Sequence, residues 1–242
     1  MRMISALGDA LIAVLLAPCC ACCRTPLEHP TRGAVCGGCW SSIPAASDPL
    51  CETCGDTLAS WRRTDDGDAR CSRCRRTRRI ITRGRSIGAY EGALRDILHA
   101  LKYDHRRSIA RPLGALMARA GREVLTGAEI AVPVPLHASR HYARGFNQAA
   151  ELAAHLGLPV VHALRRTRAT VTQTDLPEWQ RHENVSGAFA LRTPIRRGAV
   201  VVVVDDVSTT GATVDACARV LLEAGAGDVR ALTAARAAAR LP

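Results

Sequence analysis

The feature that most constrains this chain is the segment VVVVDDVSTTGAT, which covers residues 201–213. Its four consecutive valines show no polar alternation, which predicts a strand buried on both faces, as in a parallel α/β sheet. Two carboxylates, Asp205 and Asp206, follow at once, and a short polar loop leads through Gly211 into a predicted helix over 212–224. Ligands of open α/β sheets bind at the carboxyl ends of strands, beside helix N-termini that attract anions. The segment therefore predicts a ligand site.

The chemistry of this segment suits a sugar phosphate. Carboxylates can accept ribose hydroxyls or hold a hydrated Mg²⁺, and a loop rich in hydroxyl and N–H groups can hold a phosphate monoester. An ordinary buried strand with a polar turn is the alternative, but it gives no reason for two adjacent acids before a Thr-Thr-Gly-Ala-Thr loop. The segment resembles, along all its residues, the 5-phosphoribosyl-1-pyrophosphate (PRPP) motif of type I phosphoribosyltransferases. The resemblance assigns the 5-phosphate to Ser208, Thr209, Thr210, Gly211, Ala212 and Thr213.

Length and charge set the limits of the interpretation. With 242 residues, 48% of them apolar, the chain can form one α/β domain and a smaller module. The net charge of +11 indicates polyanionic partners such as nucleic acid or phosphorylated substrates. Lys102 is the only lysine, however, and an arginine excess of this kind also follows from the base composition of a genome. The charge alone is therefore a weak argument for nucleic acid.

Residues 1–17 imitate a signal peptide. Asp9 interrupts the apolar run, which is also too short to span a bilayer, and Pro18 does not fit a lipoprotein cleavage site before Cys19. We expect a short amphipathic helix that packs its apolar face on its own protein. No membrane span and a cytoplasmic location are the corresponding predictions.

Ten of the eleven cysteines lie between residues 19 and 74. Eight of them form four CxxC pairs, which are Cys20/Cys23, Cys36/Cys39, Cys51/Cys54 and Cys71/Cys74. CxxC places two thiolates on one turn, which suits tetrahedral Zn²⁺, so four pairs predict two structural zinc sites in a double zinc ribbon. A disulfide framework is the alternative and would need an exported chain. The first pair can also be read as Cys19/Cys22, although we prefer Cys20/Cys23, and Cys217 is expected to be a small core residue.

Arginines are dense around the last CxxC pair, between residues 62 and 85. One interpretation is a surface that follows a phosphate backbone, and the other is the solvated face of an arginine-rich protein. The candidate nucleic-acid contacts are Arg75, Arg76, Arg78 and Arg79.

The remaining chain alternates strand and helix patterns, so we divide it into residues 1–78, the helix and double ribbon, and 79–242, the α/β domain. Strands are expected at 85–90, 130–134, 159–164, 189–191, 200–204 and 229–234, all in one sheet. Helices are expected at 91–103, 108–126, 147–156 and 212–224. The loop over 133–148 carries Arg140 and Arg144 just past a strand end, which suits a pyrophosphate; a basic surface loop is the alternative. The polar stretch 165–183 is long enough to be a functional lid.

In this order the motifs resemble the ComF family of competence-associated, phosphoribosyltransferase-like proteins over nearly the whole chain. The matching pieces are four CxxC knuckles, LKY at 101–103, PVPLH at 133–137, RGFNQA at 144–149, a spaced QxxLxxxxRxxN pattern, GAF at 187–189 and VDDVSTTGAT. Arg24 departs from the family, which usually has glycine there. The resemblance adds His137 and Lys102 to the pyrophosphate contacts, and Gln173, Arg181 and Asn184 to the lid.

The resemblance implies a type I phosphoribosyltransferase fold, PRPP with Mg²⁺, and a role in DNA uptake during natural transformation, where single-stranded DNA is handled in the cytoplasm. Competence or DNA-processing proteins are the protein partners it implies, and it supplies no acceptor substrate. Asp205 and Asp206 would then be the catalytic pair of a phosphoribosyltransferase. The alternatives are a transferase of nucleotide metabolism with an unknown small acceptor, a non-enzymatic PRPP sensor that binds single-stranded DNA through its ribbon, and a zinc-dependent scaffold.

Overall fold

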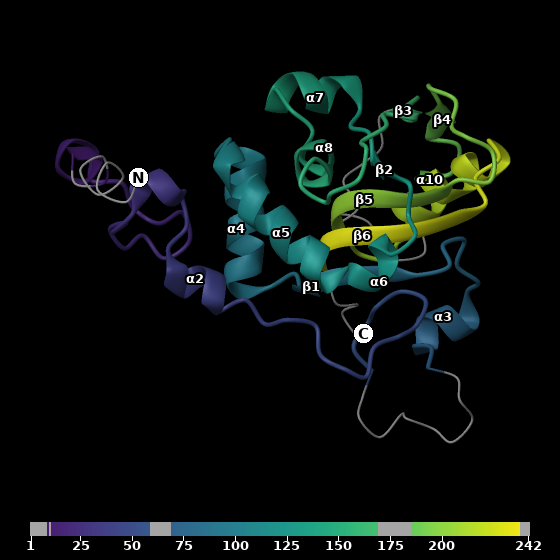
Figure 1. Cartoon of the computed structure of the whole chain (residues 1–242), viewed down its shortest axis with the longest axis horizontal. Helices are drawn as coiled ribbons and strands as arrows, with labels where there is room; N and C mark the ends of the chain where they lie inside the picture. Colours follow the sequence, from purple (N-terminus) through teal and green to yellow (C-terminus); the bar gives the residue numbers. More distant parts are fainter. Residues whose placement is uncertain (1–8, 10, 59–68, 169–184, 238–242) are drawn as a thin grey trace.

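A four-stranded parallel sheet forms the centre of the molecule, with strand order β1-β6-β5-β2. Figure 1 shows it in the computed structural model, which describes residues 9, 11–58, 69–168 and 185–237. The strands are β1 (Gly84–Ala89), β2 (Ile130–Pro133), β5 (Val200–Ser208) and β6 (Asp228–Arg236). A single parallel bridge between Ala131 and Val160 extends the sheet beyond β2. The parallel sheet predicted from the valine run is confirmed.

Helices cover both faces of the sheet because the valines of β5 alternate between them. Val202 and Val204 belong to the core with α4, α5 and α8, whereas Val201 and Val203 belong to the core with α10. The helices of this body are α4 (Gly92–Tyr103), α5 (Ala110–Ala120), α6 (Arg122–Leu125), α7 (Ala138–Arg144), α8 (Gln148–Ala153) and α10 (Ala212–Glu223), with a 3₁₀ turn, η3 (Arg107–Ile109). Cys217 is fully buried in the α10 core, as expected.

Three expectations for this body need correction. β4 (Phe189–Leu191) does not join the central sheet but pairs antiparallel with β3 (Leu164–Arg166) in a separate two-stranded sheet. The strand expected over 159–164 is reduced to the bridge at Val160, and its last residue, Leu164, instead begins β3 and packs with Phe189 in the α10 core. The helix expected over 108–126 is broken at Gly121, where a Cβ would lie 2.4 Å from a methyl of Leu232.

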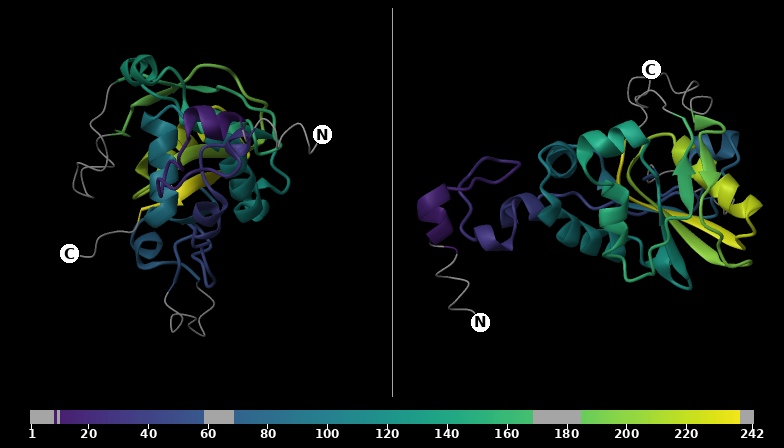
Figure 2. Two further views of the ribbon diagram at one scale, coloured as in Figure 1. Left: turned by 90° about the vertical axis from the view of Figure 1, so that its left-hand side faces the viewer. Right: turned by 90° about the horizontal axis from the view of Figure 1, so that it is seen from above.

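The two zinc ribbons, each built from two CxxC pairs, lie at different places on the molecule. The first ribbon, with η1 (Pro30–Arg32) and α2 (Gly37–Ser41), projects away from the body beside α4 (Figures 1 and 2). The second ribbon, with α3 (Ser72–Arg76), lies against the body below the sheet. Between them the chain runs along the edge strand β1, where the Ala46 N–H donates to the Ile87 carbonyl at 2.7 Å.

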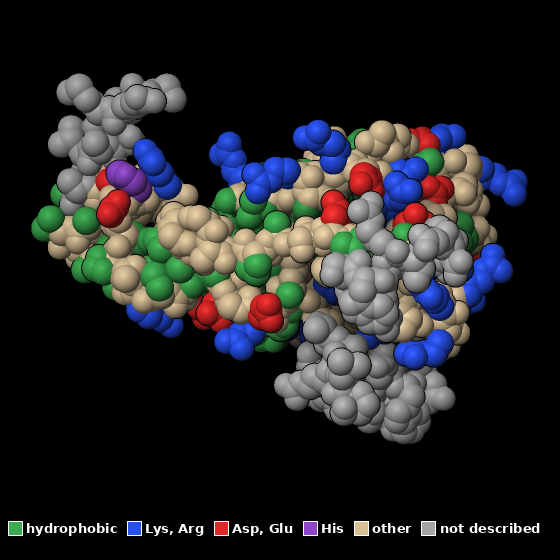
Figure 3. All heavy atoms as spheres, turned by 90° about the horizontal axis from the view of Figure 1, so that it is seen from below, with side chains coloured by type: hydrophobic (Ala, Val, Ile, Leu, Met, Phe, Trp, Pro, Cys, Tyr) green, Lys and Arg blue, Asp and Glu red, His purple; other side chains and the backbone are tan. Residues whose placement is uncertain are grey.

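The N-terminal helical residues 11–16 differ from expectation. Leu11, Val14, Leu15 and Leu16 are between 62% and 83% exposed, so this apolar face does not pack on the described part of the protein. Figure 3 shows hydrophobic side chains gathered at this end of the molecule, with Lys and Arg side chains spread over the body. Asp9 instead ties the segment to the first ribbon, accepting hydrogen bonds from the Thr31 N–H and hydroxyl at 2.9 and 2.6 Å. Each helix within the described ranges is too short or too polar to cross a bilayer.

Candidate functional site

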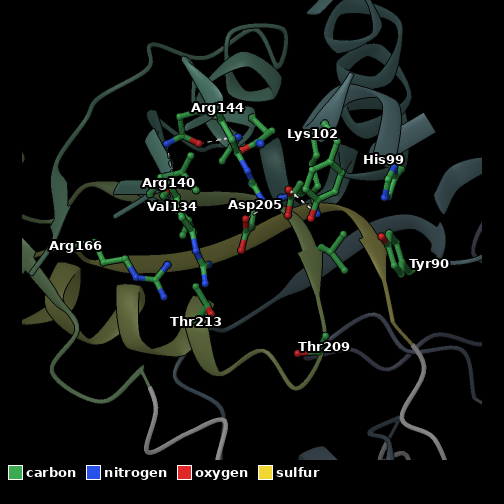
Figure 4. A pocket seen from close by; sticks show the side chains of 17 residues that line it. Tyr90, His99, Lys102, Val134, Arg140, Arg144, Arg166, Asp205, Thr209 and Thr213 are labelled. Atoms are coloured by element: carbon green, nitrogen blue, oxygen red, sulfur yellow. Dashed lines mark hydrogen bonds and ion pairs between the residues drawn. The ribbon is translucent and has the colours of Figure 1, made fainter. Parts of the chain in front are cut away.

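A cavity of about 250 Å³ lies at the carboxyl end of β5. Figure 4 shows Lys102 from α4, Arg140 and Arg144 from α7, and Arg166 from β3 converging on Asp205. The residues that line the cavity are Tyr90, His99, Lys102, Tyr103, Val134, Leu136, Arg140, Arg144, Asn147, Gln148, Ala149, Arg166, Asp205, Asp206, Val207, Thr209 and Thr213. A concave site with a few converging charges at a strand terminus is typical of ligand binding in α/β proteins.

The two acids reach this cavity from opposite faces of the sheet, because successive side chains of a strand alternate. Asp206 follows the valines of the α4 face, and its Oδ2 lies 2.8 Å from Nζ of Lys102 on α4. Asp205 follows the valines of the α10 face, where the charge of Arg166 lowers its pKa and where Asp205 in turn raises the pKa of Cys217. Both acids lie within β5, which extends through Ser208, so the predicted loop begins later than expected.

The charges of the cavity shift one another's pKa values. Burial and the neighbouring charge of Asp206 raise the pKa of Asp205 to about 7, against the opposing effects of the Asp206 N–H, Lys102 and Arg166. Burial disfavours the Lys102 ammonium, but Asp206 and, to a smaller extent, Tyr90 and Asp205 outweigh it, so the pKa of Lys102 is raised. Burial and the charge of Arg140 lower the pKa of Arg166. A strongly shifted carboxyl in a cleft is a feature of functional sites.

The segment expected to be an arginine-bearing loop forms a helix, α7, and this is a correction. Arg140 and Arg144 are four residues apart, so α7 presents both on one face, toward the cavity. Gly145, with φ of 68°, ends the helix in the left-handed conformation that glycine adopts readily. His137 caps the start of α7, its Nδ1 accepting from the Ser139 N–H at 3.4 Å, and it does not line the cavity.

The hydroxylated loop, which covers residues 208–213, supplies Thr209 and Thr213 to the cavity wall. Thr210 is buried and its Oγ1 accepts from the Ala212 N–H at 3.3 Å, so it shapes the turn. Ser208 and Ala212 are also buried. Gly211, with φ of 83°, is the N-cap of α10.

Sequence reasoning gave no site role to several residues of this cavity, among them Arg166, Tyr90 and Gln148. Arg166 comes from β3, Tyr90 from the end of β1, and Gln148 from the first turn of α8. Gln148 is 2% exposed, and its Nε2 has no hydrogen-bond partner among the described residues. A buried amide without a partner is costly, so a donor aimed into a cavity suits a ligand acceptor. The lid residues Gln173, Arg181 and Asn184 lie outside the described residues.

The cysteines form two tetrads, Cys20, Cys23, Cys36 and Cys39, and Cys51, Cys54, Cys71 and Cys74. Zn–S bonds of about 2.3 Å in a tetrahedron place the sulfur atoms about 3.8 Å apart. The observed separations of Cys20–Cys39, Cys23–Cys36 and Cys54–Cys71 are 3.8, 3.7 and 3.6 Å. The residues therefore fit Zn²⁺, and Cys19 and Cys22 lie outside the first tetrad.

Comparisons with known proteins support both the zinc ribbons and the α/β domain. Residues 11–75 match the double zinc ribbon domain and residues 143–242 match the phosphoribosyl transferase domain. The DNA utilization protein YhgH of Escherichia coli K12 is 34% identical over 228 residues, covering 87% of this chain and 93% of that protein. Competence protein F of Haemophilus influenzae is 30% identical, covering 90% and 96%, and competence protein ComFC of Bacillus subtilis is 28% identical, covering 79% of each. The chain belongs to the ComF family.

This ComF-family protein thus combines a phosphoribosyltransferase domain with two cysteine tetrads that form the structural zinc sites of a double ribbon. A chain of the allosteric regulatory enzyme of purine biosynthesis also matches, at 23% identity and a TM-score of 0.34, covering 52% of this chain and 26% of that one. A TM-score this low establishes no likeness of fold by itself.

The arginines of the second ribbon divide into two groups. Arg75, Arg76 and Arg78 are exposed on or just after α3, as a nucleic-acid surface requires. Arg79 is 8% exposed and its Nε lies 2.6 Å from Asp215 Oδ2, so we withdraw it from the candidate nucleic-acid contacts.

Proposed function

We propose that the cavity binds PRPP with Mg²⁺ and that the protein transfers the phosphoribosyl group to an acceptor. The observation that supports this most strongly is the placement of Asp205, Asp206, Thr209 and Thr213 in one cavity with four cationic side chains. Paired acids suit ribose hydroxyls, the threonine loop suits the 5-phosphate, and the cations suit the pyrophosphate. The match of residues 143–242 to the phosphoribosyl transferase domain supports the same assignment.

In the proposed reaction, the bond between ribose C1 and the pyrophosphate oxygen breaks as the acceptor attacks C1, through a cation-like transition state comparable to that of glycosyl chemistry. Asp205 and Asp206 hold the 2- and 3-hydroxyls, and their negative charge stabilises the positive charge that develops on the ribose. Mg²⁺, when bound together with PRPP, would neutralise part of the pyrophosphate charge. Arg140 and Arg144 hold this leaving group from one face of α7.

Lys102 and Gln148 have roles that the geometry suggests. The Lys102 ammonium forms a 2.8 Å ion pair with Asp206 Oδ2, which holds this side chain in place for the ribose hydroxyls. We assign the Gln148 amide as a donor to a ligand oxygen, because its Nε2 is buried at the cavity wall. Residues 165 and 166 of the expected lid belong to β3, and the remainder up to 184 stays a proposed lid that would exclude water.

Release of pyrophosphate from PRPP with a panel of nucleobases and amines tests the transfer. An acceptor-dependent release that is lost in Asp205→Asn supports the enzyme. PRPP binding without release by any acceptor would favour a non-enzymatic PRPP sensor, and absence of PRPP binding would favour a scaffold.

A second proposed activity is binding of single-stranded DNA by the second ribbon in the cytoplasm. It is supported by the exposure of Arg75, Arg76 and Arg78, and by relatives whose names are DNA utilization protein and competence protein. Aromatic residues make up only 3% of the chain, so few are available to stack on bases and the binding should be mainly electrostatic. Fluorescence anisotropy with labelled single strands at several salt concentrations measures this activity.

A further inference from the structure

Arg79 joins the second ribbon to the hydroxylated loop of the cavity. Its Nε lies 2.6 Å from Asp215 Oδ2 in the first turn of α10. Its Nη1 donates to the Thr210 carbonyl at 3.0 Å and its Nη2 to the Gly211 carbonyl at 3.3 Å. One buried guanidinium therefore binds the loop and the following helix together, which the fixed fork of its donors makes possible.

Other groups of the same segment extend this contact. Arg73 Nη1 donates to the Thr209 carbonyl at 3.3 Å, and the Ile80 N–H donates to Asp215 Oδ1 at 3.2 Å. Three consecutive loop carbonyls, of residues 209–211, thus accept hydrogen bonds from Arg73 on α3 of the second ribbon and from Arg79, which follows the ribbon directly in the chain. Because a trans peptide points the next N–H opposite to its carbonyl, the N–H groups of residues 210–212 are directed away from the ribbon.

The sequence of the loop is matched to this arginine. Gly211 has φ of 83°, and a Cβ at this position would lie 1.9 Å from Nη2 of Arg79. Any side chain larger than hydrogen would therefore displace the guanidinium as well as strain the backbone. Gly211 and Arg79 are 132 residues apart in the chain, and the guanidinium occupies the space that a side chain at position 211 would need.

The second ribbon depends on its metal site for its own structure. Its small core contains Leu58 and the four cysteines of the second tetrad. A core of this composition buries little apolar surface, so bound Zn²⁺ supplies most of the folding free energy. The folded ribbon is fastened to the body by Arg236 on β6, whose Nη2 donates to Asp56 at 3.2 Å, and by Arg85 on β1, whose Nη1 donates to the Glu52 carbonyl at 3.3 Å.

We propose that the second zinc ribbon supports the phosphate-binding loop, through Arg79 and Arg73, and that Zn²⁺ in the second tetrad thereby sets the affinity of the loop for a phosphate monoester. The first ribbon packs in the core beside α4 and not against this loop, so we expect its zinc site to lack this effect (Figure 1). This inference rests on the proposed function for the identity of the ligand. Arg79 is a positioning residue, because it contacts the loop and lies outside the residues that line the cavity.

The test uses the full chain with two pairs of matched variants. Arg79→Lys keeps the charge but loses the fork, and Arg119→Lys, at an exposed position on α5, is its control. Cys54→Ser/Cys74→Ser empties the second tetrad, and Cys23→Ser/Cys36→Ser empties the first. Hydrogen exchange of amides 209–213 is measured, with amides of β6 as the control for the fold, together with calorimetric titration of Mg²⁺-PRPP and of ribose 5-phosphate.

Charge-assisted hydrogen bonds of about 1.5–3 kcal/mol predict at least about tenfold faster exchange of the loop amides in Arg79→Lys and in the second-tetrad variant. Affinity for both phosphate ligands should fall by about the same factor, while both control variants change little. Unchanged loop exchange in Arg79→Lys overturns the inference. Loss of protection in β6 of the second-tetrad variant would mean that the fold itself is disturbed. In that case Arg79→Lys alone decides the inference, because it keeps all cysteines. If the wild-type protein binds neither phosphate ligand, the proposed function fails and the exchange data still decide the inference.

Discussion

Asp205 is the residue on which the pH dependence of the cavity depends. Burial and the charge of Asp206 raise its pKa from 3.8 to about 7, so the folded state prefers the protonated carboxyl. The stability that this group contributes is fully present below its unfolded pKa of 3.8 and is lost as the pH rises through about 7. The ionised form that ligand binding needs is therefore the form that the fold tolerates less well.

Replacing Asp205 by Asn should stabilise the protein at neutral and alkaline pH. Asn mimics the protonated carboxyl, and each pKa unit corresponds to about 1.4 kcal/mol, so the gain above pH 7 is at most about 4 kcal/mol and vanishes in acid. Urea unfolding at several pH values measures it. Asp104→Asn, an exposed acid at the end of α4, is the control. Identical pH profiles for Asp205→Asn and wild type would show that Asp205 is not held at a raised pKa.

Lys102 should set the pH at which PRPP binds. Affinity for Mg²⁺-PRPP should rise as the pH passes about 7, because Asp205 ionises there. Lys102 lowers the pKa of Asp205, so Lys102→Met should move this rise to higher pH. Calorimetric titrations on both sides of pH 7 measure the midpoint. A midpoint that stays in place would exclude Lys102 as an electrostatic partner of the two acids.

Among the elements, α7 shows most clearly how local sequence positions two side chains of the cavity. His137 caps its start, Gly145 ends it, and Arg140 and Arg144 lie on one face between them. The sequence contains each of these signals, including the spacing of four between the arginines and the glycine after the last one. These signals predict a helix at this place, and the interpretation of residues 133–148 as a loop did not take them into account.

Arg144 should hold pyrophosphate through this face. Its guanidinium lies 5.2 Å from the centre of the Tyr103 ring, which orients it toward the cavity. Arg144→Ala should weaken pyrophosphate binding by at least about tenfold, as expected for a lost charge-assisted hydrogen bond. Arg119→Ala, which removes an exposed arginine of α5, should change it little. Equal effects of the two variants in calorimetry would mean that only net charge matters.

Which site residues can be predicted from the sequence depends on how far apart in the chain the interacting residues lie. The strand β5, its two acids and the start of α10 are encoded within one short segment, so they could be predicted locally. Arg166 and Gln148 reach the cavity only through the packing of β3 and α8, for which no local pattern exists. Arg79 looks like its exposed neighbours in sequence, because charge density does not distinguish a buried arginine with internal partners from a solvated one. The boundary between residues 78 and 79 stays a prediction.

At the scale of the whole molecule, the two ribbons should differ in how tightly they hold zinc. The second tetrad is buried at all four cysteines, whereas Cys23 of the first is exposed. We expect two Zn²⁺ per chain and two phases of release to a chelator, the first tetrad losing its ion earlier because solvent reaches it. Metal analysis and chelator absorbance measure both. Cys23→Ser/Cys36→Ser should remove the fast phase alone, and a single phase in the wild-type protein would contradict the difference.

Nucleic-acid binding should belong to the second ribbon and be separable from PRPP binding. Each phosphate contact on a single strand adds about 0.7 to the slope of log affinity against log salt, so replacing Arg75, Arg76 and Arg78 by Gln should flatten it by up to about 2. PRPP affinity should not change. The control of equal charge replaces Arg106, Arg111 and Arg119 in the same way. These arginines are exposed on α5 or directly before η3, outside the second ribbon. An equal loss in both triple variants would assign the binding to overall charge.

The most direct test of the account is calorimetric titration of Mg²⁺-PRPP into the wild-type protein and into Asp205→Asn/Asp206→Asn. We predict one PRPP bound per wild-type chain, and binding largely lost in the double variant, whose side chains keep their shape but not their charge. Hydrogen exchange of β5 and β6 should show that the variant remains folded. Absence of binding by the wild-type protein, or equal affinity of the folded double variant, would contradict the assignment of this cavity to PRPP.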